Sequence, residues 1–194
     1  MTQPLAKLDP SEAALVLIDL QRGVTARQLA PRSAADVVRT SAALASEFRA
    51  RGGLVMLVHV SFAPNGADVP PQDVDEPFPR QALPAGWDQF VDEIAPQPGD
   101  VLITKRQWGA FYGTDLDLQL RRRRRDTIVL GGIATNFGVE STARDAWERG
   151  YRLLLVEDAM ASMSADDHAF AVNRIFPRLG HVCTAQDVIA RLGQ

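Results

Sequence analysis

Apolar runs rich in β-branched residues alternate with helical stretches along this chain of 194 residues. The apolar runs, bounded by turn residues, predict six strands at 13–19, 54–60, 101–104, 127–132, 152–157 and 181–184. The stretches between them predict helices at about 34–51, 114–124, 138–150, 164–178 and 185–192. This alternation is typical of βαβ units, so we expect an α/β fold with three layers: a Rossmann-like six-stranded parallel sheet with helices on both faces.

Local signals mark several of the expected helix ends. Ser33 precedes the first long helix, and Gly52 and Gly53 follow it. Gly150 stands at a position where a helix commonly ends on a glycine, and Thr184 can cap the last helix. These residues support the boundaries that the apolar pattern gives.

Residues 61–100 interrupt the alternation. Prolines make most of this segment extended and helix-poor, with a short helix expected near Trp87–Ile94. An irregular segment of this length in a compact domain is usually functional or mobile. We interpret residues 61–98 as a loop that covers a site or as a subunit contact, and a plain surface excursion is the alternative.

The length, net charge and cysteine count of the chain argue against several classes of protein. The length fits one domain over residues 1–194, and the net charge of −3 argues against nucleic acid as the main partner. No apolar run approaches the ~20 residues of a membrane span, and the N-terminus lacks the pattern of a signal peptide. The single Cys excludes an internal disulfide and suits a reducing cytoplasm, where we expect the protein to be located.

Five consecutive arginines, Arg121–Arg125, are the one feature that favours a nucleic-acid partner. They close a predicted helix, where cations complement the negative end of the helix dipole. Five adjacent residues of a helix cannot all face one groove, and the chain offers no matching basic stripe. We therefore interpret the run as a solvated helix end.

The segment 126–145 combines an apolar strand, a glycine turn and a helix. The strand runs into Gly131 and Gly132, and helix formers resume at Val139. In open α/β sheets ligands bind beyond the carboxyl ends of the strands, and a helix start offers free N–H groups to an anion or oxyanion. Such a turn suits a nucleophile, yet Gly138, at the position that would hold one, has no side chain.

Two further strands end in charged residues. Asp19 follows the fully apolar run 13–18, a position where a carboxylate is costly to bury unless it is paired or used. Lys105 follows the run 101–104. Beside Asp19 the lysine would lower the pKa of the carboxyl group, whereas burial would raise it, so the sequence leaves open whether Asp19 is an acid or a base. The alternatives are a structural Asp that caps a loop and a solvated Lys.

These three segments together closely resemble the isochorismatase-like hydrolases, a superfamily that also holds nicotinamidases and other cysteine hydrolases. The resemblance covers residues 10–190 approximately and implies catalytic roles for Asp19 and Lys105. It places Gly138 at the position of the nucleophilic Cys, which the isochorismatases themselves lack, since they use the Asp as an acid. It also implies a cis peptide at Ile133–Ala134 that aims N–H groups at a developing oxyanion.

The same segments supply candidate substrate-binding residues. Trp108 and Phe111, with Tyr112, could wall a flat organic ligand, and core or interface packing is the alternative. The turn residues Ile133, Ala134, Thr135 and Asn136 could bind the polar end of a substrate, although capping of the following helix is the safer interpretation of Asn136. The resemblance implies that Gln21, two residues after the Asp, orients Asp19, and a surface loop amide is the alternative.

The sequence predicts neither a metal nor a cofactor. Nicotinamidases place an Asp and two His after the strand that corresponds to 54–60, whereas here His59 has no second His nearby, so we expect a satisfied sheet histidine. His168 and His181 lack ligand spacing. Phe62 or a neighbour stands where isochorismatases have a Gln, a departure that argues against isochorismate as substrate. We expect Cys183 to be a small core residue.

Three functions remain after the sequence analysis. The first is hydrolysis of a small organic, acidic substrate through Asp19 acid–base catalysis, with Lys105 holding a substrate carboxylate or developing negative charge. The second, a cysteine amidohydrolase, needs a thiolate that Gly138 cannot supply. The third is a non-catalytic binding or assembly module that retains the pocket. The family resemblance further implies a homodimer or homotetramer, and the substrate stays open.

Overall fold

The computed structural model describes residues 7–71, 73–77 and 83–193. Its sheet has six strands, all parallel, in the order β3-β2-β1-β4-β5-β6. The strands are β1 Ala13–Ile18, β2 Leu54–Val60, β3 Val101–Lys105, β4 Thr127–Ile133, β5 Arg152–Ala161 and β6 His181–Cys183. The expected α/β class and six-stranded parallel sheet are confirmed, and β5 runs four residues further than predicted.

The helices follow the predicted order with three differences. They are α1 Arg22–Thr25, α2 Ala34–Ala50, η1 Asp92–Ile94, α3 Leu116–Arg122, η2 Thr135–Val139, α4 Glu140–Glu148, α5 Ala165–Phe170, η3 Ala171–Ile175, η4 Phe176–Arg178 and α6 Ala185–Ile189. The short α1 was not predicted. The single helix expected at 164–178 is three consecutive pieces, α5, η3 and η4. The helix expected near Trp87–Ile94 is only the short 3₁₀ turn η1.

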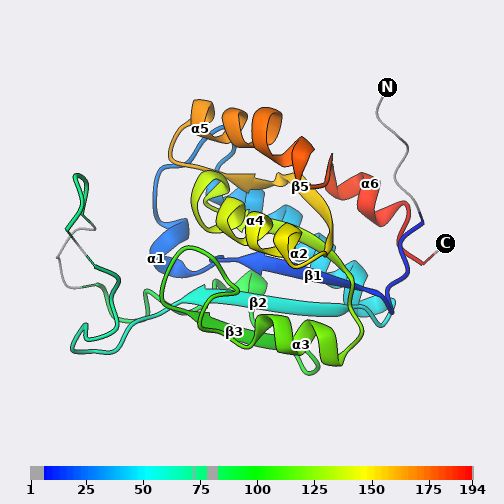
Figure 1. Ribbon diagram of the computed structural model, residues 1–194, viewed down its shortest axis with the longest axis horizontal. Coiled ribbons are helices and arrows are strands. Elements are labelled where there is room, and N and C mark those ends of the chain that lie inside the picture. Colours follow the sequence, from blue (N-terminus) through cyan, green and yellow to red (C-terminus); the bar gives the residue numbers. More distant parts are fainter. Residues whose placement is uncertain (1–6, 72, 78–82, 194) are drawn as a thin grey trace.

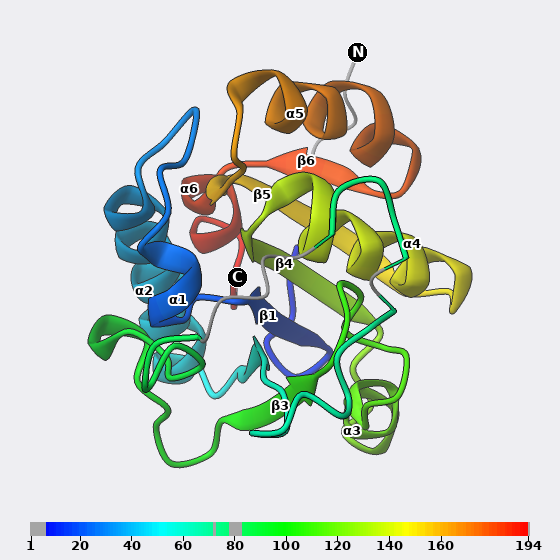
Figure 2. The same cartoon turned by 90° about the vertical axis from the view of Figure 1, so that its left-hand side faces the viewer.

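Helices cover both faces of the sheet because the residues of β1 point alternately to either side. Ala13, Leu15 and Leu17 belong to a core that includes residues of α2 and α6. Their neighbours 14, 16 and 18 belong to a second core with α3 and α4. All six residues of β1 are buried, as expected for a central strand of a parallel sheet. The two helix layers are visible on opposite sides of the strands in Figure 2.

The predicted helix caps are present. The Ser33 side chain accepts a hydrogen bond from the backbone N–H of Asp36 at the start of α2. Thr184 forms a capping box with Asp187 at the start of α6. Gly150 follows the last residues of α4 with a φ of +79°, the left-handed conformation that ends many helices.

The carboxyl ends of β1 and β4 form the topological switch point of the sheet. β2 and β3 lie on one side of β1, and β4, β5 and β6 lie on its other side. Ligands bind at such points because the connections on either side run to opposite faces of the sheet. These ends lie on the left in Figure 1 and face the viewer in Figure 2.

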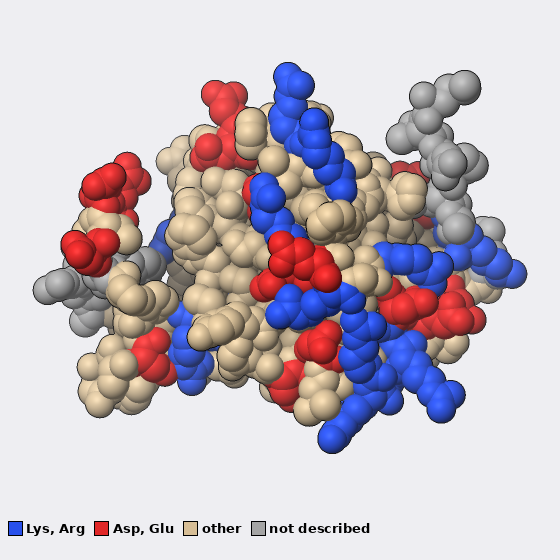
Figure 3. Space-filling view, viewed as in Figure 1, with Lys and Arg blue, Asp and Glu red and all other residues tan. Residues whose placement is uncertain are grey.

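The arginine run lies at the end of α3 and in the turn that follows it. Arg121 forms an ion pair with Asp117, with an N–O distance of 3.5 Å, and Arg125 donates to the carbonyl oxygen of Pro10 at 2.9 Å. Figure 3 shows acidic side chains among the basic ones on this face. The structure therefore agrees with a solvated helix end of mixed charge.

The described parts of segment 61–100 project beyond the carboxyl ends of the strands in Figure 1. The later part returns to the body, where the N–H of Gly23 donates to Trp87 O at 2.8 Å and that of Arg22 donates to Gln89 O at 2.9 Å. Residues 72 and 78–82, and the N-terminal residues used to argue against a signal peptide, lie outside the described residues. No helix within the described ranges is long and apolar enough to cross a membrane.

Candidate active site

Asp19 is the first residue after β1, at the switch point. Its φ of +53° is unusual for a residue other than glycine, and its backbone N–H donates to Val58 O at 2.8 Å. The side chain is 9% exposed, and Oδ2 accepts a hydrogen bond from Lys105 Nζ at 2.7 Å. The second oxygen, Oδ1, is buried without a hydrogen-bond partner among the described residues. One carboxylate oxygen is thus fixed, whereas the other is buried without a partner among the described residues.

Lys105 ends β3 and is 2% exposed. Besides Asp19, its ammonium group donates to Gln107 O at 3.1 Å and to Trp108 O at 2.8 Å. An ammonium group has three N–H donors, so all three are engaged by the protein. Lys105 would have to release one of these acceptors before it could hold a substrate carboxylate.

Burial raises the pKa of Asp19 above its ordinary value, although the charge and the hydrogen bond of Lys105 act in the opposite direction. The carboxyl group loses its hydration because the residue is only 6% exposed. It therefore retains its proton at a higher pH than an exposed aspartate would. This direction is the one that a general acid requires.

Gly138 lies against this pair. A Cβ atom at this position would be 3.2 Å from Asp19 Oδ2 and 3.3 Å from Lys105 Nζ, and 3.0 Å from a methyl carbon of Ile18. Asp19 and the glycine turn therefore lie side by side at the carboxyl ends of the strands. Any side chain at 138 would touch both charged groups.

Hydrogen bonds to His168 and Ser162 fix the turn that leads to Gly138. The peptide bond Ile133–Ala134 is cis, as the family resemblance implied. Thr135 is fully buried, and its hydroxyl group shares a hydrogen bond with His168 Nδ1 at 2.8 Å. Asn136 accepts a hydrogen bond from Ser162 instead of capping a helix, so the capping interpretation is wrong. The cap position belongs to Ala134, which has no side-chain acceptor.

Gln21 contacts neither solvent nor the Asp19 carboxylate. It is fully buried, its Nε2 donates to Val60 O at 3.0 Å, and its Oε1 accepts from Val60 N at 2.9 Å. This paired contact fixes the loop after β1 to the end of β2. The alternative of a surface loop amide is therefore wrong, because the backbone of β2 satisfies the buried amide. That Gln21 orients Asp19, as the resemblance implies, stays a prediction.

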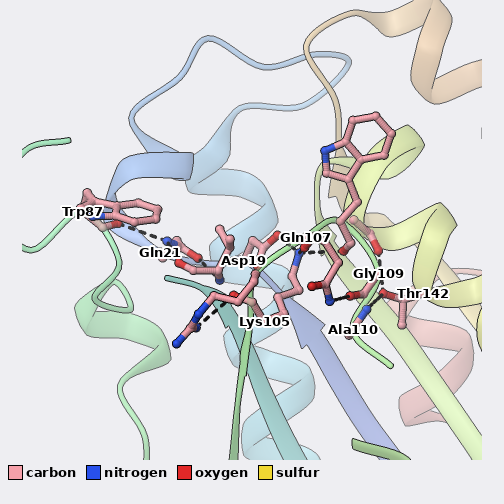
Figure 4. A network of polar contacts seen from close by, with 12 residues as sticks. Asp19, Gln21, Trp87, Lys105, Gln107, Gly109, Ala110 and Thr142 are labelled. Carbon is pink, nitrogen blue, oxygen red and sulfur yellow. Dashed lines mark hydrogen bonds and ion pairs between the residues drawn. The ribbon is translucent and has the colours of Figure 1, made fainter. Parts of the chain in front are cut away.

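The aromatic residues after Lys105 separate into two groups. Trp108 is 63% exposed and packs edge-on against Phe137, with ring centres 4.9 Å apart. Phe111 is buried in the core, where it contacts Tyr151 near the amino end of β5. The expectation that Phe111 walls a ligand is wrong, because its ring points to the opposite end of the sheet. In Figure 4, Trp87 lies on the Gln21 side of Asp19.

The remaining histidines and the cysteine have local roles. His59 bonds through Nδ1 to Asp88 O and through Nε2 to Thr104 Oγ1, both at 2.8 Å, as expected of a satisfied sheet histidine. Cys183 is buried in the core, and burial raises its pKa to about 12. Within the described ranges there is no group of three or more metal-ligating side chains.

Sequence reasoning missed two residues that complete the site. Thr142 connects the loop after Lys105 with the helix after Gly138, and Gln107 ties that loop together internally, as Figure 4 shows. For Thr142 a signal exists, because it follows Gly138 by four residues and so lies on the same face of the helix. For Gln107 no sequence pattern distinguishes the side chain from an ordinary loop amide.

A parallel sheet with a carboxylate and an ammonium group paired at its switch point defines a class of α/β proteins that bind small molecules at the strand ends. The chain matches the isochorismatase domain over residues 13–187, and it belongs to the isochorismatase family. The resemblance noted in the sequence is thereby confirmed. The protein is an isochorismatase-family hydrolase.

Three relatives place the chain within the family. It is 46% identical over 188 residues to the uncharacterized isochorismatase family protein YecD of Escherichia coli O157:H7, covering 97% of this chain and all of the relative. An isochorismatase family protein from Burkholderia thailandensis is 49% identical with a TM-score of 0.93, over 97% and 99% of the two chains. A cysteine hydrolase from Pseudomonas syringae pv. phaseolicola is 28% identical with a TM-score of 0.82, over 98% of each chain.

Proposed function

We propose that this protein hydrolyses a small organic, acidic substrate through Asp19 acid–base catalysis, without a cysteine nucleophile. One observation carries the proposal: Gly138, a residue without a side chain, stands beside the Asp19–Lys105 pair. A Cβ there would touch both charged groups, so the position is suited to a nucleophile that Gly138 does not supply. The substrate must therefore react with a proton or with water instead of a thiolate.

Asp19 supplies the proton in this scheme. Its raised pKa keeps the carboxyl group protonated at higher pH, and Oδ1 is the oxygen without a hydrogen-bond partner among the described residues. The proton moves to the terminal vinyl carbon of an enol ether, and the oxocarbenium ion that forms takes up water to give a hemiketal, which breaks down to an alcohol and a carbonyl compound. While Asp19 is ionised, Lys105 stabilises its carboxylate through Oδ2. The ionised Asp19 can then activate water. General acid–base catalysis of this kind contributes ~10²–10⁴-fold.

The preference for an acidic substrate rests on the charges around the pair. Lys105 and the start of the helix after Gly138 both favour a negative group nearby. Because the three donors of Lys105 are engaged, the backbone N–H groups of the 133–138 turn are the better candidates for direct contact with the anion.

The test is a steady-state screen with vinyl ethers, amides and N-carbamoyl compounds, followed by Asp19→Asn on any substrate found. The amide is nearly isosteric and cannot ionise, so turnover should fall by ~10²-fold or more while ligand binding persists. Asp126→Asn, which changes a carboxylate at the amino end of β4, is the control and should retain activity. Full turnover in Asp19→Asn would remove Asp19 from the chemistry.

A binding or assembly module is the second candidate. The observation that favours it is that Asp19 and Lys105 are nearly buried and form an ion pair with one another. If no compound of the three classes is hydrolysed while calorimetry detects their binding, this second function replaces the first.

A further inference from the structure

Thr142 is a buried polar residue that touches both sides of the site. It lies in the first turn of α4 and is fully buried. Its hydroxyl group donates to Gly138 O at 2.7 Å and accepts from the backbone N–H of Ala110 at 3.1 Å. One hydroxyl group thus connects the turn of position 138 with the loop that follows β3. Figure 4 shows Thr142 facing this loop.

The contact to Ala110 distinguishes this residue from an ordinary helical threonine. Threonine hydroxyls in helices often bond to the carbonyl oxygen four residues earlier, and the bond to Gly138 O is of this kind. The second bond reaches a segment 32 residues away in the sequence. A local explanation therefore accounts for only one of the two bonds.

The loop that Thr142 holds is the loop that fixes Lys105. Gln107 ties it together internally, because its Nε2 donates to Gly109 O at 2.9 Å and to Tyr112 O at 2.7 Å. The carbonyl oxygens of residues 107 and 108 accept two of the three hydrogen bonds of Lys105. Movement of this loop would therefore move the ammonium group.

The sheet itself does not set the distance between Lys105 and Gly138. Lys105 ends β3, Gly138 follows β4, and two strands, β2 and β1, lie between them. The connection that spans this gap runs from Lys105 through the loop to Ala110, Thr142 and Gly138. The ring contact of Trp108 with Phe137 also spans it, but Trp108 is 63% exposed.

We propose that Thr142 is a positioning residue of the site, which holds the loop 106–112 so that the Lys105 ammonium group stands beside Asp19 and position 138. The inference rests on the proposed function, since it assigns Thr142 a role in the site that performs it. Loss of the hydroxyl group leaves the N–H of Ala110 buried without a partner. The loop then shifts, and Lys105 shifts with it.

A thiol placed at position 138 reports on this geometry without any substrate. In Gly138→Cys the new side chain would begin 3.3 Å from Lys105 Nζ, and a neighbouring cation lowers a thiol pKa and speeds alkylation at neutral pH. The only other thiol, Cys183, is buried with a pKa of about 12, so it should not react with iodoacetamide at neutral pH. The rate of reaction with iodoacetamide across a pH series gives the pKa of the thiol.

The experiment compares Thr142→Val and Thr142→Ser in the Gly138→Cys protein. Valine keeps the shape and loses the hydroxyl group, so alkylation at pH 7 should slow roughly tenfold as the thiol pKa rises. Serine keeps the hydroxyl group and should restore the rate. Thr127→Val, a buried threonine at the amino end of β4, is the matched control and should leave the rate unchanged.

Three results would overturn the proposal. One is an equal alkylation profile in the valine and serine proteins. Another is a slowing in the Thr127 control as large as in Thr142→Val, which would indicate a general loss of packing. The third is a Gly138→Cys thiol that reacts like an exposed cysteine, since Lys105 would then not stand beside it. If Thr142→Val does not fold, Thr142→Ala carries the comparison, with melting temperatures recorded for every variant.

Because the readout is thiol reactivity, it separates the two proposals. A protein that hydrolyses nothing in the screen can still show the Thr142 effect. Conversely, if the protein hydrolyses a substrate while substitution of Thr142 leaves the alkylation rate of the position-138 thiol unchanged, the proposed function stands and the positioning role of Thr142 is refuted.

Discussion

Asp19 combines three properties that no ordinary surface aspartate has: a left-handed backbone, a buried side chain and one oxygen without a partner. Aspartate tolerates this backbone conformation better than most residues, and such conformations cluster at functional sites. Asp19 and Lys105 could be located from the sequence because each stands at the end of an apolar strand, whereas the correspondence of Gly138 to a nucleophile came from the family resemblance. The sequence could not predict that burial outweighs the lysine charge, since that depends on the chain that covers the pair.

Removing the lysine should reveal the cost of the buried carboxylate. In Lys105→Met, Asp19 loses its partner and two backbone carbonyl groups lose a donor, so we expect destabilisation of about 3–5 kcal/mol near neutral pH. The Asp19 pKa, already raised, rises further. Because the folded state then binds the proton more tightly than the unfolded state, stability is greatest below the unfolded pKa and falls as pH rises through the folded pKa.

The measurement is urea unfolding of the variant and the wild type at several values between about pH 4 and pH 8. The difference in unfolding free energy should grow with pH. Arg39→Met, which breaks an exposed ion pair with Asp36, is the comparison and should cost much less stability because water screens exposed charges. A pH-independent difference for Lys105→Met would contradict the further rise of the Asp19 pKa in the variant.

Other side chains were misjudged because their partners are distant in the sequence. Gln21 bonds to a residue 39 positions away, and Thr142 bonds to one 32 positions away. Phe111 follows the site lysine by six residues, yet the chain turns in between and delivers the ring to the core. Sequence proximity to a catalytic residue is therefore a weaker guide than the strand-end positions.

At the scale of the elements, the strands were predictable and several helix details were not. Apolar runs between turn residues mark a buried strand whatever lies around it. The end of β5 was missed because Glu157 and Asp158 interrupt its apolar pattern, although the strand continues to Ala161. The helix expected at 164–178 is divided because a π-helical turn replaces regular α-helix and Pro177 begins the last 3₁₀ turn.

Gly132 connects β4 to the site, and only glycine fits there. Its φ is +125°, and a Cβ would lie 2.2 Å from the carbonyl oxygen of Ile18. Gly132→Ala should therefore push β4 away from β1 at the switch point and destabilise the protein by more than about 1–3 kcal/mol. Thermal unfolding measures the effect. Gly99→Ala is the control, since φ is also positive there but no atom lies within 4 Å of the added carbon. Equal losses in the two variants would show that the close approach is unimportant.

At the scale of the whole molecule, the site depends on the meeting of two halves of the sheet. β1 to β3 bring Asp19 and Lys105, and β4 brings Gly138. The order of strands follows from right-handed crossovers on either side of the first strand. A sequence pattern of alternating elements therefore suffices to place the site at the carboxyl ends of the strands. The role of segment 61–98 does not follow from such rules, because it has little regular structure.

The last prediction is that the protein forms a homodimer or homotetramer. Several large apolar side chains are exposed, among them Trp108 at 63%, Tyr112 at 76% and Phe170 at 60%. Aromatic residues are enriched at subunit interfaces because their burial removes much apolar surface from water. Light scattering should give a mass that is a multiple of 21.2 kDa, and Tyr112→Glu should lower it if the aromatic group beside the site forms the contact. A monomer at every micromolar concentration tested would refute self-association.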